Sequence, residues 1–495
     1  MKKKQFLLSL LMAIVMMAMS PQRMWALGGS GTSSDPFTIA NENDLFDFAD
    51  RVNNRSYGDR CFKLVANITL TKAWTPIGTS SNPYTATFDG NNKTISGLNL
   101  TATAANAGFF GYVNGATIKN FSLAGSISSG YDNTGSVVGS ADGATKIYNV
   151  YSSVNITMTA AKSHIGGIAG QLLQENSKVS EIKGCAYSGT MNLGSCSDSN
   201  GGIVGYCEKN ANIEIEYCFF SGSMSTSVNS PNALGGILGY ADDDGDSQNF
   251  QSLKYCFVSG TLSPNRGTYV GAIAGQPKGK VANTGIIANN NYVSGVAANA
   301  LGNSKTSATS TPINISVTAG TGGKVSQSYV NPTSTTPTQL KVEATTAEHY
   351  HFGSWSDNGA QTHNVGLTDN VNLTASFAID RVQILVTSLY GAPGTTQGTG
   401  TYDYGSKITI KAIPDEHAHF VEWGDGDTHA TRTITVTKEC TTYHAYFAID
   451  QHTITVKANN DEAGTVSGGG TFDYNSTKTI SATPKTGYHF VEWND

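Results

Sequence analysis

Histidines gather toward the C-terminus, where imidazole side chains could bind a metal ion or act as a general base. Five of them stand shortly before a tryptophan of a repeated unit, namely His349, His351, His417, His419 and His489. His351, His419 and His489 occupy one position of a repeated unit, and a single site would not require three copies. The HExxH pattern of zinc peptidases does not occur. We therefore predict no metal site, although Asp415 adds a nearby carboxylate.

The same repeated units contain Trp355, Trp423 and Trp493, and an aromatic ring can serve as a platform for a sugar. Each tryptophan follows a phenylalanine by three residues within a strand-like pattern. A large aromatic residue that occurs once in each small β-domain usually anchors its core. We therefore predict core positions for these three tryptophans and a structural role for Trp74.

Cysteines could contribute redox or metal chemistry. The chain has seven: Cys61, Cys185, Cys196, Cys207, Cys218, Cys256 and Cys440. No CxxC pair occurs, although thiolate metal sites commonly contain one. Cys185, Cys218 and Cys256 share one repeat position with Val150 and Asn291, where cysteine would act as a small hydrophobic residue. We predict that these three are buried and unbridged, and that Asn291 forms or caps an amide ladder.

Cys196 and Cys207 flank a single repeat motif, GGIVG. Whether these two pair is left open, because an odd number of cysteines in an exported chain leaves at least one without an intramolecular partner.

An acidic turn resembles part of a calcium-binding loop. Its members are Asp242, Asp243, Asp244 and Asp246 around Gly245. With Gly245 at the sixth position of such a loop, Tyr240 would be the first and no glutamate stands at the twelfth. We therefore predict an acidic inter-coil turn without calcium.

The chain contains no GxSxG elbow, phosphate-binding loop or dinucleotide fingerprint. The sequence thus predicts no catalytic, cofactor-binding or metal-binding residues and no cofactor.

Composition indicates the scaffold that carries these residues. Of 495 residues, 14% are charged and 55 are glycine, a profile of short strands and tight turns. The formal charge of -6 gives no support for nucleic-acid binding, which needs a concentrated basic face. The sequence therefore predicts an all-β protein.

Residues 1–26 read as a signal peptide, because three lysines precede an apolar run from Phe6 to Met19. That run is too short to span a bilayer as a helix, and no later stretch approaches the required length. We expect cleavage after Ala26, export, and no transmembrane segment thereafter.

Two series of repeats organise the next 277 residues, 27–303. The first series is GSVVG, GGIAG, GGIVG, GGILG and GAIAG, which end at Gly139, Gly170, Gly205, Gly239 and Gly275. A second element follows each copy, for example IKGCAYSG and IEYCFFSG. Each unit supplies short strands that cannot form a core alone but can when stacked. This pattern predicts a β-solenoid.

Residues 29–123 contain GSGTSSDPFTI, DLFDFA, FKLVANITL, WTPIG, FDGNNKTISGLNL, GFFG and IKNFSL in that order. Together with the GGIVG units, this order resembles bacterial surface proteins with GLUG motifs. The resemblance implies a right-handed parallel β-helix on an exported, adhesin-like or peptidase-associated protein.

Residues 304–312, SKTSATSTP, have the composition of a linker. Three longer units follow at 313–380, 381–450 and 451–495, marked by HFGSW, HFVEW and HFVEW. Alternating stretches such as KITIKAIP predict small β-domains. They resemble divergent internalin B-type (Listeria-Bacteroides) repeats, which implies non-catalytic surface modules. The third unit lacks the FAID strand that closes the other two, so we expect a truncated domain.

We therefore expect a secreted or cell-surface adhesin or stalk-like protein that is not an enzyme. Its partner would be an extracellular glycan or a host or matrix protein, bound by variable loops such as 172–180 and 241–252, with the C-terminal repeats acting as spacers. The alternative is a carbohydrate-active lyase or glycosidase, or a peptidase-associated β-helix enzyme. A carboxylate cluster within about 5–10 Å on one solenoid face would favour glycosidase action.

Overall fold

The computed structural model describes residues 27–173, 178–196, 198–209, 211–227, 233–242, 250–264, 269–278, 286–302 and 310–494. The predicted signal peptide and most of the predicted linker lie outside these ranges. The chain divides into two compact units. The first contains the residues up to Thr318 with 325–343 and 359–374, and the second contains 319–324, 344–358 and 375–495.

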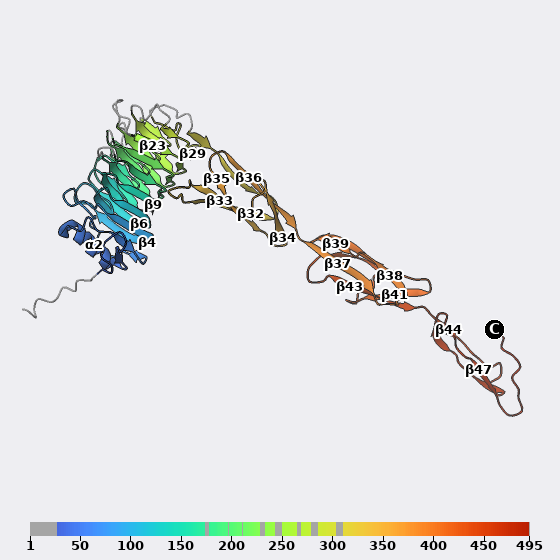
Figure 1. The fold of residues 1–495 in the computed structure, drawn as a ribbon. Helices are drawn as coiled ribbons and strands as arrows, with labels where there is room; N and C mark the ends of the chain where they lie inside the picture. The colour runs from blue at the N-terminus through green and yellow to red at the C-terminus, as the bar shows by residue number, and fades with distance from the viewer. Residues whose placement is uncertain are drawn as a thin grey trace, which may run out of the picture. The chain divides into compact units, whose positions relative to one another are not determined.

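The first unit is a parallel β-solenoid, which confirms the predicted fold class. Figure 1 shows its strands side by side in the blue to yellow-green part of the chain. Three sheets run along it, and each coil contributes to all three in the central part.

The largest sheet has 19 strands. They are β1 (Phe37–Ile39), β2 (Phe62–Leu64), β3 (Ile68–Thr69), β4 (Thr87–Thr101), β6 (Thr117–Ser129), β9 (Lys146–Ser152), β10 (Asn155–Met158), β13 (Ser180–Lys183), β14 (Ala186–Tyr187), β15 (Thr190–Asn192), β18 (Ile213–Glu216), β19 (Phe219–Phe220), β20 (Ser223–Ser225), β23 (Phe250–Lys254), β24 (Phe257–Val258), β25 (Thr261–Ser263), β28 (Ile287–Ala288), β29 (Asn291–Val293) and β30 (Thr311–Ile313).

The two smaller sheets are built from the GGIxG-type motifs. One contains β5 (Phe110–Asn114), β8 (Val138–Asp142), β12 (Ala169–Leu172), β17 (Val204–Cys207), β22 (Leu238–Ala241) and β27 (Ala274–Pro277). The other contains β7 (Thr134–Gly135), β11 (Ile165–Gly166), β16 (Asn200–Gly201), β21 (Ala233–Gly235) and β26 (Tyr269–Gly271).

Strand β30 corrects the predicted domain boundary. Thr311 and Pro312, assigned to a linker from their composition, pair in parallel with Asn291 and Tyr292 of β29. The solenoid sheet therefore continues to Ile313, because β pairing at this position outweighs the weak strand propensity of Pro312.

The first glycine of each GGIxG-type motif is required by close packing. A Cβ added to Gly201 would lie 1.9 Å from the carbonyl oxygen of Val204, and one added to Gly235 would lie 1.8 Å from that of Leu238. Neither glycine has a positive φ, so the constraint is steric. The repeated glycine therefore lets the chain turn tightly between the two smaller sheets.

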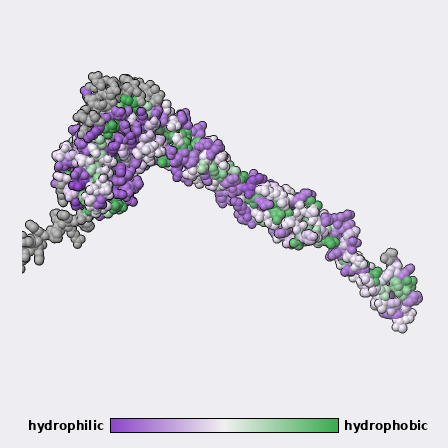
Figure 2. All heavy atoms as spheres, in the orientation of Figure 1, coloured by the Kyte–Doolittle hydropathy of each residue, from purple (hydrophilic) through white to green (hydrophobic). Residues whose placement is uncertain are grey.

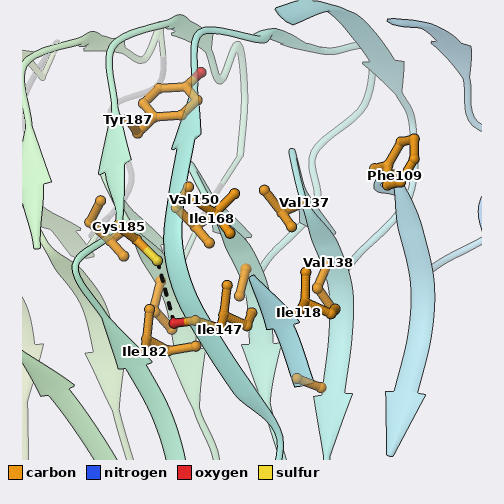
Figure 3. Close-up of a cluster of buried hydrophobic side chains, with 14 of the residues drawn as sticks. Phe109, Ile118, Val137, Val138, Ile147, Val150, Ile168, Ile182, Cys185 and Tyr187 are labelled. Carbon is orange, nitrogen blue, oxygen red and sulfur yellow. Dashed lines mark hydrogen bonds between the residues drawn. The ribbon is translucent and has the colours of Figure 1, made fainter. Parts of the chain in front are cut away.

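The interior of the solenoid is a set of in-register columns. Ile182 pairs with Ile147 of the preceding coil and with Ile215 of the following coil, and all three are fully buried. Figure 3 shows Ile147, Ile182 and Val150 clustered with Cys185 inside the coils. Stacking like residues at the strand spacing fills the narrow interior.

The cysteine column is confirmed, with one correction to its last member. Cys185, Cys218 and Cys256 are buried free thiols, and the Cys185 Sγ lies 3.5 Å from the carbonyl oxygen of Ile147 (Figure 3). Pairing of Phe257 with Asn291 places Asn290 opposite Cys256.

Asn290, and not Asn291, therefore ends the column. Its buried amide accepts a hydrogen bond from the Cys256 N–H at 2.9 Å and donates one to the Leu253 carbonyl at 2.8 Å. The predicted cap exists, but alignment on the shared serine misplaced it by one residue, because the last coil is longer by one residue between Asn290 and Ser294 than the preceding coil is between Cys256 and Ser259.

The one helix among the described residues, α2 (Glu42–Arg55), was not predicted. The Asn41 side chain caps its first turn, and Asp44 Oδ2 accepts the Ala40 N–H at 2.8 Å. Phe48 is buried and stacks on Phe62 with ring centroids 3.8 Å apart. The helix thus supplies an aromatic face to the first coils.

Small antiparallel sheets form the C-terminal repeats. The first repeat contains β31 (Ile315–Ala319), β32 (Gly323–Val330), β33 (Gln339–Thr346), β34 (Tyr350–Trp355), β35 (Thr362–Gly366) and β36 (Val371–Ile379). The second contains β37 (Arg381–Ser388), β38 (Gly394–Gln397), β39 (Gly400–Asp403), β40 (Lys407–Pro414), β41 (Ala418–Trp423), β42 (Thr431–Thr435) and β43 (Thr442–Ile449). The third contains β44 (Gln451–Ile454), β45 (Gly464–Ser467), β46 (Gly470–Asp473) and β47 (Ser481–Pro484).

Within the described part of the chain, no helix has the length and apolar character needed to cross a membrane.

Candidate functional site

The histidines of the repeats form pairwise contacts. His351 Nδ1 lies 3.1 Å from an Asp380 oxygen, and His419 Nδ1 lies 2.8 Å from an Asp450 oxygen. Each of these histidines therefore faces one carboxylate. In the described ranges, no three His, Cys, Asp or Glu side chains gather in a way that could hold a metal ion.

The predicted role of the tryptophans as core anchors is confirmed for two of the three. Trp355 and Trp423 are 1% and 0% exposed, whereas Trp493 is only partly buried. Trp74 is also buried, stacks on Phe109 at 4.7 Å and donates its indole N–H to the Phe109 carbonyl. The rings of Trp355, Trp423 and Trp74 are therefore not platforms for a ligand.

Of the other candidates from the sequence, the structure describes the two cysteines but not most of the acidic turn or the tips of the two loops. Cys196 and Cys207 are both free, buried thiols. The acidic turn and the tips of the two predicted recognition loops, residues 243–249 and 174–177, lie outside the described residues.

A charged cluster lies on the outward face of the large sheet. The Lys183 ammonium contacts three carboxylates, at 3.1 Å from Glu181, 2.5 Å from Glu214 and 3.4 Å from Glu216. Lys146 also pairs with Glu181, at 2.8 Å. Because the three carboxylates share one ammonium, they lie within the separation of about 5–10 Å that glycosidase carboxylates span.

One carboxylate of this cluster, Glu181, has the opposite pKa shift from the general acid of a glycosidase pair. Partial burial alone would raise the pKa of Glu181, but hydrogen bonds from Lys146, Tyr148 and Lys183 outweigh it and lower this pKa to about 2. A general acid that protonates a leaving group needs a raised pKa. Glu181 is therefore a permanent anion suited to ion pairing.

A corner lies beside this cluster, where each coil bends through one residue in the left-handed conformation. The residues at the corner, in chain order, are Asn120, Asn149, Gly184, Tyr217, Tyr255 and Asn289, with φ between 53° and 66°. Asparagine and glycine adopt this conformation readily. The Asn149 amide also donates to Asn120 Oδ1 at 3.1 Å, so the asparagines support one another.

Tyr217 and Tyr255 depart from this rule. Their φ values are 54° and 56°, in a region that is strained for a bulky side chain. Their rings stack with centroids 5.1 Å apart and an interplanar angle of 11°, and Tyr255 is 40% exposed. Strained residues that persist often mark functional sites.

The surroundings of the two rings are polar. On the strand before the corner, Glu216 pairs in register with Lys254 and with Lys183. The Ser252 hydroxyl donates to Glu216 at 2.6 Å. The corner thus combines an exposed aromatic surface with hydrogen-bonding groups in two successive coils, and we call Tyr217, Tyr255, Glu216 and Lys254 the tyrosine corner.

A second tyrosine pair, Tyr206 and Tyr240, lies on the sheet that contains β17 and β22. Their centroids are 5.7 Å apart, His164 stacks on Tyr206 at 4.2 Å, and the Lys278 ammonium lies 4.8 Å from the Tyr240 ring centroid. Their ring faces already have partners within the protein. This pair is therefore a useful comparison for the tyrosine corner.

Sequence reasoning missed the tyrosine corner, although both tyrosines stood in an aligned column. The signal was the alternation of Asn and Gly with Tyr at one repeat position, because Asn and Gly together indicate a left-handed residue. The face of the solenoid shown in Figure 2 is mainly hydrophilic.

Comparison with known protein families finds a match in the C-terminal part of the chain only. Residues 313–381, 384–451 and 454–495 match the model of the divergent InlB B-repeat domain. This match confirms the resemblance seen in the sequence of the repeats. No curated protein matches the chain.

Among solved structures, a candidate immunoglobulin A1 protease from Bacteroides ovatus is similar over 54% of this chain and 78% of its own. The sequence identity is 22% and the TM-score is 0.41. A likeness of this extent defines neither the fold nor the function of the present chain.

Proposed function

We propose that this protein is an exported, non-catalytic surface protein of the adhesin type that binds an extracellular glycan at the tyrosine corner. The stacked, left-handed pair Tyr217–Tyr255 carries the proposal, because a structural role alone would be met by asparagine, as at Asn149 and Asn289. The divergent InlB B-repeats support a surface location, since such repeats are typical of surface proteins. The GLUG-like motifs of the solenoid agree with it.

The charges around the corner favour a neutral, polyhydroxylated ligand. Lys183 and Lys254 alternate with Glu181, Glu214 and Glu216, so the face has no strong net charge. Carboxylates accept hydrogen bonds from hydroxyl groups, and the exposed Tyr255 ring offers an apolar surface to the C–H groups of a sugar.

The proposal is tested by glycan and matrix-protein arrays with the full chain, followed by the variant Tyr255→Asn. Asparagine keeps the left-handed backbone that Asn149 and Asn289 adopt and removes only the ring. If the ring is a binding hot spot, its removal costs about 2 kcal/mol, or about a 30-fold weaker Kd, without loss of stability.

Tyr206→Asn is the matched control, since the Tyr206 ring is stacked inside its own column. Equal loss of binding in both variants, or none in Tyr255→Asn, would rule out the tyrosine corner.

The alternative function, polysaccharide cleavage, is favoured by one observation, the three carboxylates around Lys183. Release of reducing ends from a bound polysaccharide, abolished by Glu214→Gln, would establish it. The low pKa of Glu181 argues only against this residue as the general acid of such a reaction.

A further inference from the structure

One column of residues on the outer face of the large sheet, next to the corner, contains three aromatic side chains. Residues Tyr151, Ala186, Phe219, Phe257 and Asn291 pair in register along it. The adjacent residues of these strands, such as Phe220, point into the core and are fully buried. Successive strand residues point to opposite faces, so Phe219 and Phe257 face away from the core.

These two rings are nevertheless covered. Phe219 and Phe257 are only 2% and 3% exposed. Their cover comes from the first C-terminal repeat, whose Tyr329 ring lies 5.2 Å from Phe219 and 5.6 Å from Phe257. Burial raises the pKa of Tyr329, in spite of a hydrogen bond with Ser259 that lowers it.

The turn that follows Tyr329 continues the contact across the corner. The Tyr151 hydroxyl donates to the Pro332 carbonyl at 2.8 Å. The Ser334 N–H donates to Asn149 Oδ1 at 2.6 Å. Thr333 and Thr336 bridge each other, so the turn itself is closed.

Gly184 makes room for this turn. A Cβ at Gly184 would lie 2.2 Å from the Thr333 carbonyl carbon, and its φ is +66°. The corner residue therefore has to be glycine in the one coil that the Thr333 backbone touches, whereas the neighbouring coils have Asn149 and Tyr217.

We propose that residues 329–336 are a lock that fastens the first repeat to the solenoid, and that the Phe219–Phe257 patch is the surface built to receive it. The patch fits the β-hairpin turn in three ways. Its two phenylalanines contact the Tyr329 ring. Tyr151 and Asn149 form hydrogen bonds with the backbone of the turn, and Gly184 has no side chain that would clash with Thr333. The solenoid and residues 325–343 then act as one body, and a pull on a bound ligand passes to the repeats through this lock as well as along the chain after Ile313. The first repeat is therefore more than the spacer that the sequence suggested.

Hydrogen exchange on the full chain tests the lock with a matched pair of variants. Gly184→Ala and Gly115→Ala impose the same backbone strain, since their φ values are +66° and +67°, but a Cβ at Gly115 meets nothing within 4 Å. We expect Ser334 to be protected in the wild type and in Gly115→Ala, and to exchange at least ten-fold faster in Gly184→Ala.

Two further variants keep the test decisive if Gly184→Ala does not fold. Asn149→Gly keeps the left-handed backbone but removes the acceptor of the Ser334 N–H, and Tyr329→Ala uncovers the two phenylalanines. We expect faster exchange at 329–336 in both, and stronger binding of a hydrophobic dye by Tyr329→Ala. Fast exchange at Ser334 in the wild type, or equal exchange in the two glycine variants, would overturn the proposal.

Discussion

The solenoid and the second C-terminal repeat bury their hydrophobic cores in opposite ways. A solenoid coil contributes strands of two to seven residues in its central part, such as β14 and β9, and its buried columns are completed by the coils before and after it. The second repeat closes its own core of nine buried residues around Trp423. A disturbance in the solenoid is therefore shared by several coils, whereas one in the repeat stays within it.

The largest difference in stability should appear when one glycine of the solenoid and one glycine of a C-terminal repeat are each replaced by alanine. Gly201→Ala places a Cβ 1.9 Å from the Val204 carbonyl oxygen. We expect destabilisation of the solenoid by more than about 4 kcal/mol, an exceptional value for one substitution. Gly366→Ala in the first repeat meets nothing within 4 Å and should change stability by less than about 0.5 kcal/mol.

Denaturant titrations that follow Trp74 for the solenoid and Trp355 for the first repeat would measure both effects. Similar stability losses in the two glycine variants would break the comparison.

Removal of a central ring tests whether the second repeat is independent. Trp423 is fully buried and donates its indole N–H to the His429 carbonyl at 2.9 Å, so Trp423→Ala should cost about 3–5 kcal/mol. Calorimetry should show the loss in the transition of the repeat and leave that of the solenoid in place. Trp493→Ala is the control, because this partly exposed ring should cost far less. A shift of the solenoid transition by Trp423→Ala would contradict local closure.

The contact between neighbouring repeats should be weaker than either core. His349 has a φ of 63° and stacks on Tyr404 at 3.5 Å, and His417 repeats this arrangement on Tyr474 at 3.7 Å. The third repeat has Gly487 at the same position, with a φ of 87°. A double-mutant cycle of His349→Gly and Tyr404→Ala should give a coupling of about 0.5–1.5 kcal/mol.

His349→Gly alone should be less destabilising than that coupling, because glycine relieves the left-handed strain. A coupling near zero would mean that the two rings lie together without stabilising the repeat boundary.

The smallest effect concerns pH. The folded-state pKa of Glu181 is about 2, below its usual value near 4.5, so its ion pairs stabilise the solenoid above pH 4.5 and this contribution is lost as the pH falls toward 2. Because the pair is partly exposed, we expect Glu181→Gln to cost no more than about 1 kcal/mol at pH 7. Urea titrations of the wild type and Glu181→Gln should converge near pH 2. A difference that stays constant across this range would exclude the ion pairs as its cause.

Sequence periodicity was sufficient for features that depend on repetition, and insufficient for those that depend on a single distant contact. The inward position of Cys185 follows from its column, and the buried Trp423 follows from its repeat. Helix α2 lies outside the repeats, where Asn41 and Asp44 formed a capping pattern without a periodic context.

The lock could not be predicted, because Tyr151 and Pro332 are 181 residues apart. Nothing in the local sequence of either partner specifies the other. For the tyrosine corner, Asn and Gly at the same repeat position indicated a left-handed residue, but the stacking of Tyr217 on Tyr255 and the exposure of Tyr255 required the structure.

The column of free thiols turns the assembly of the solenoid into a kinetic competition. Once the coils are stacked, Cys185, Cys218 and Cys256 are buried free thiols that an oxidant in the solvent cannot reach. Before stacking, the same thiols can form disulfide bridges that are absent from the finished column. In an oxidising medium the yield of native protein therefore depends on how the rate of coil closure compares with the rate of oxidation, and a reductant present only during refolding should decide the outcome.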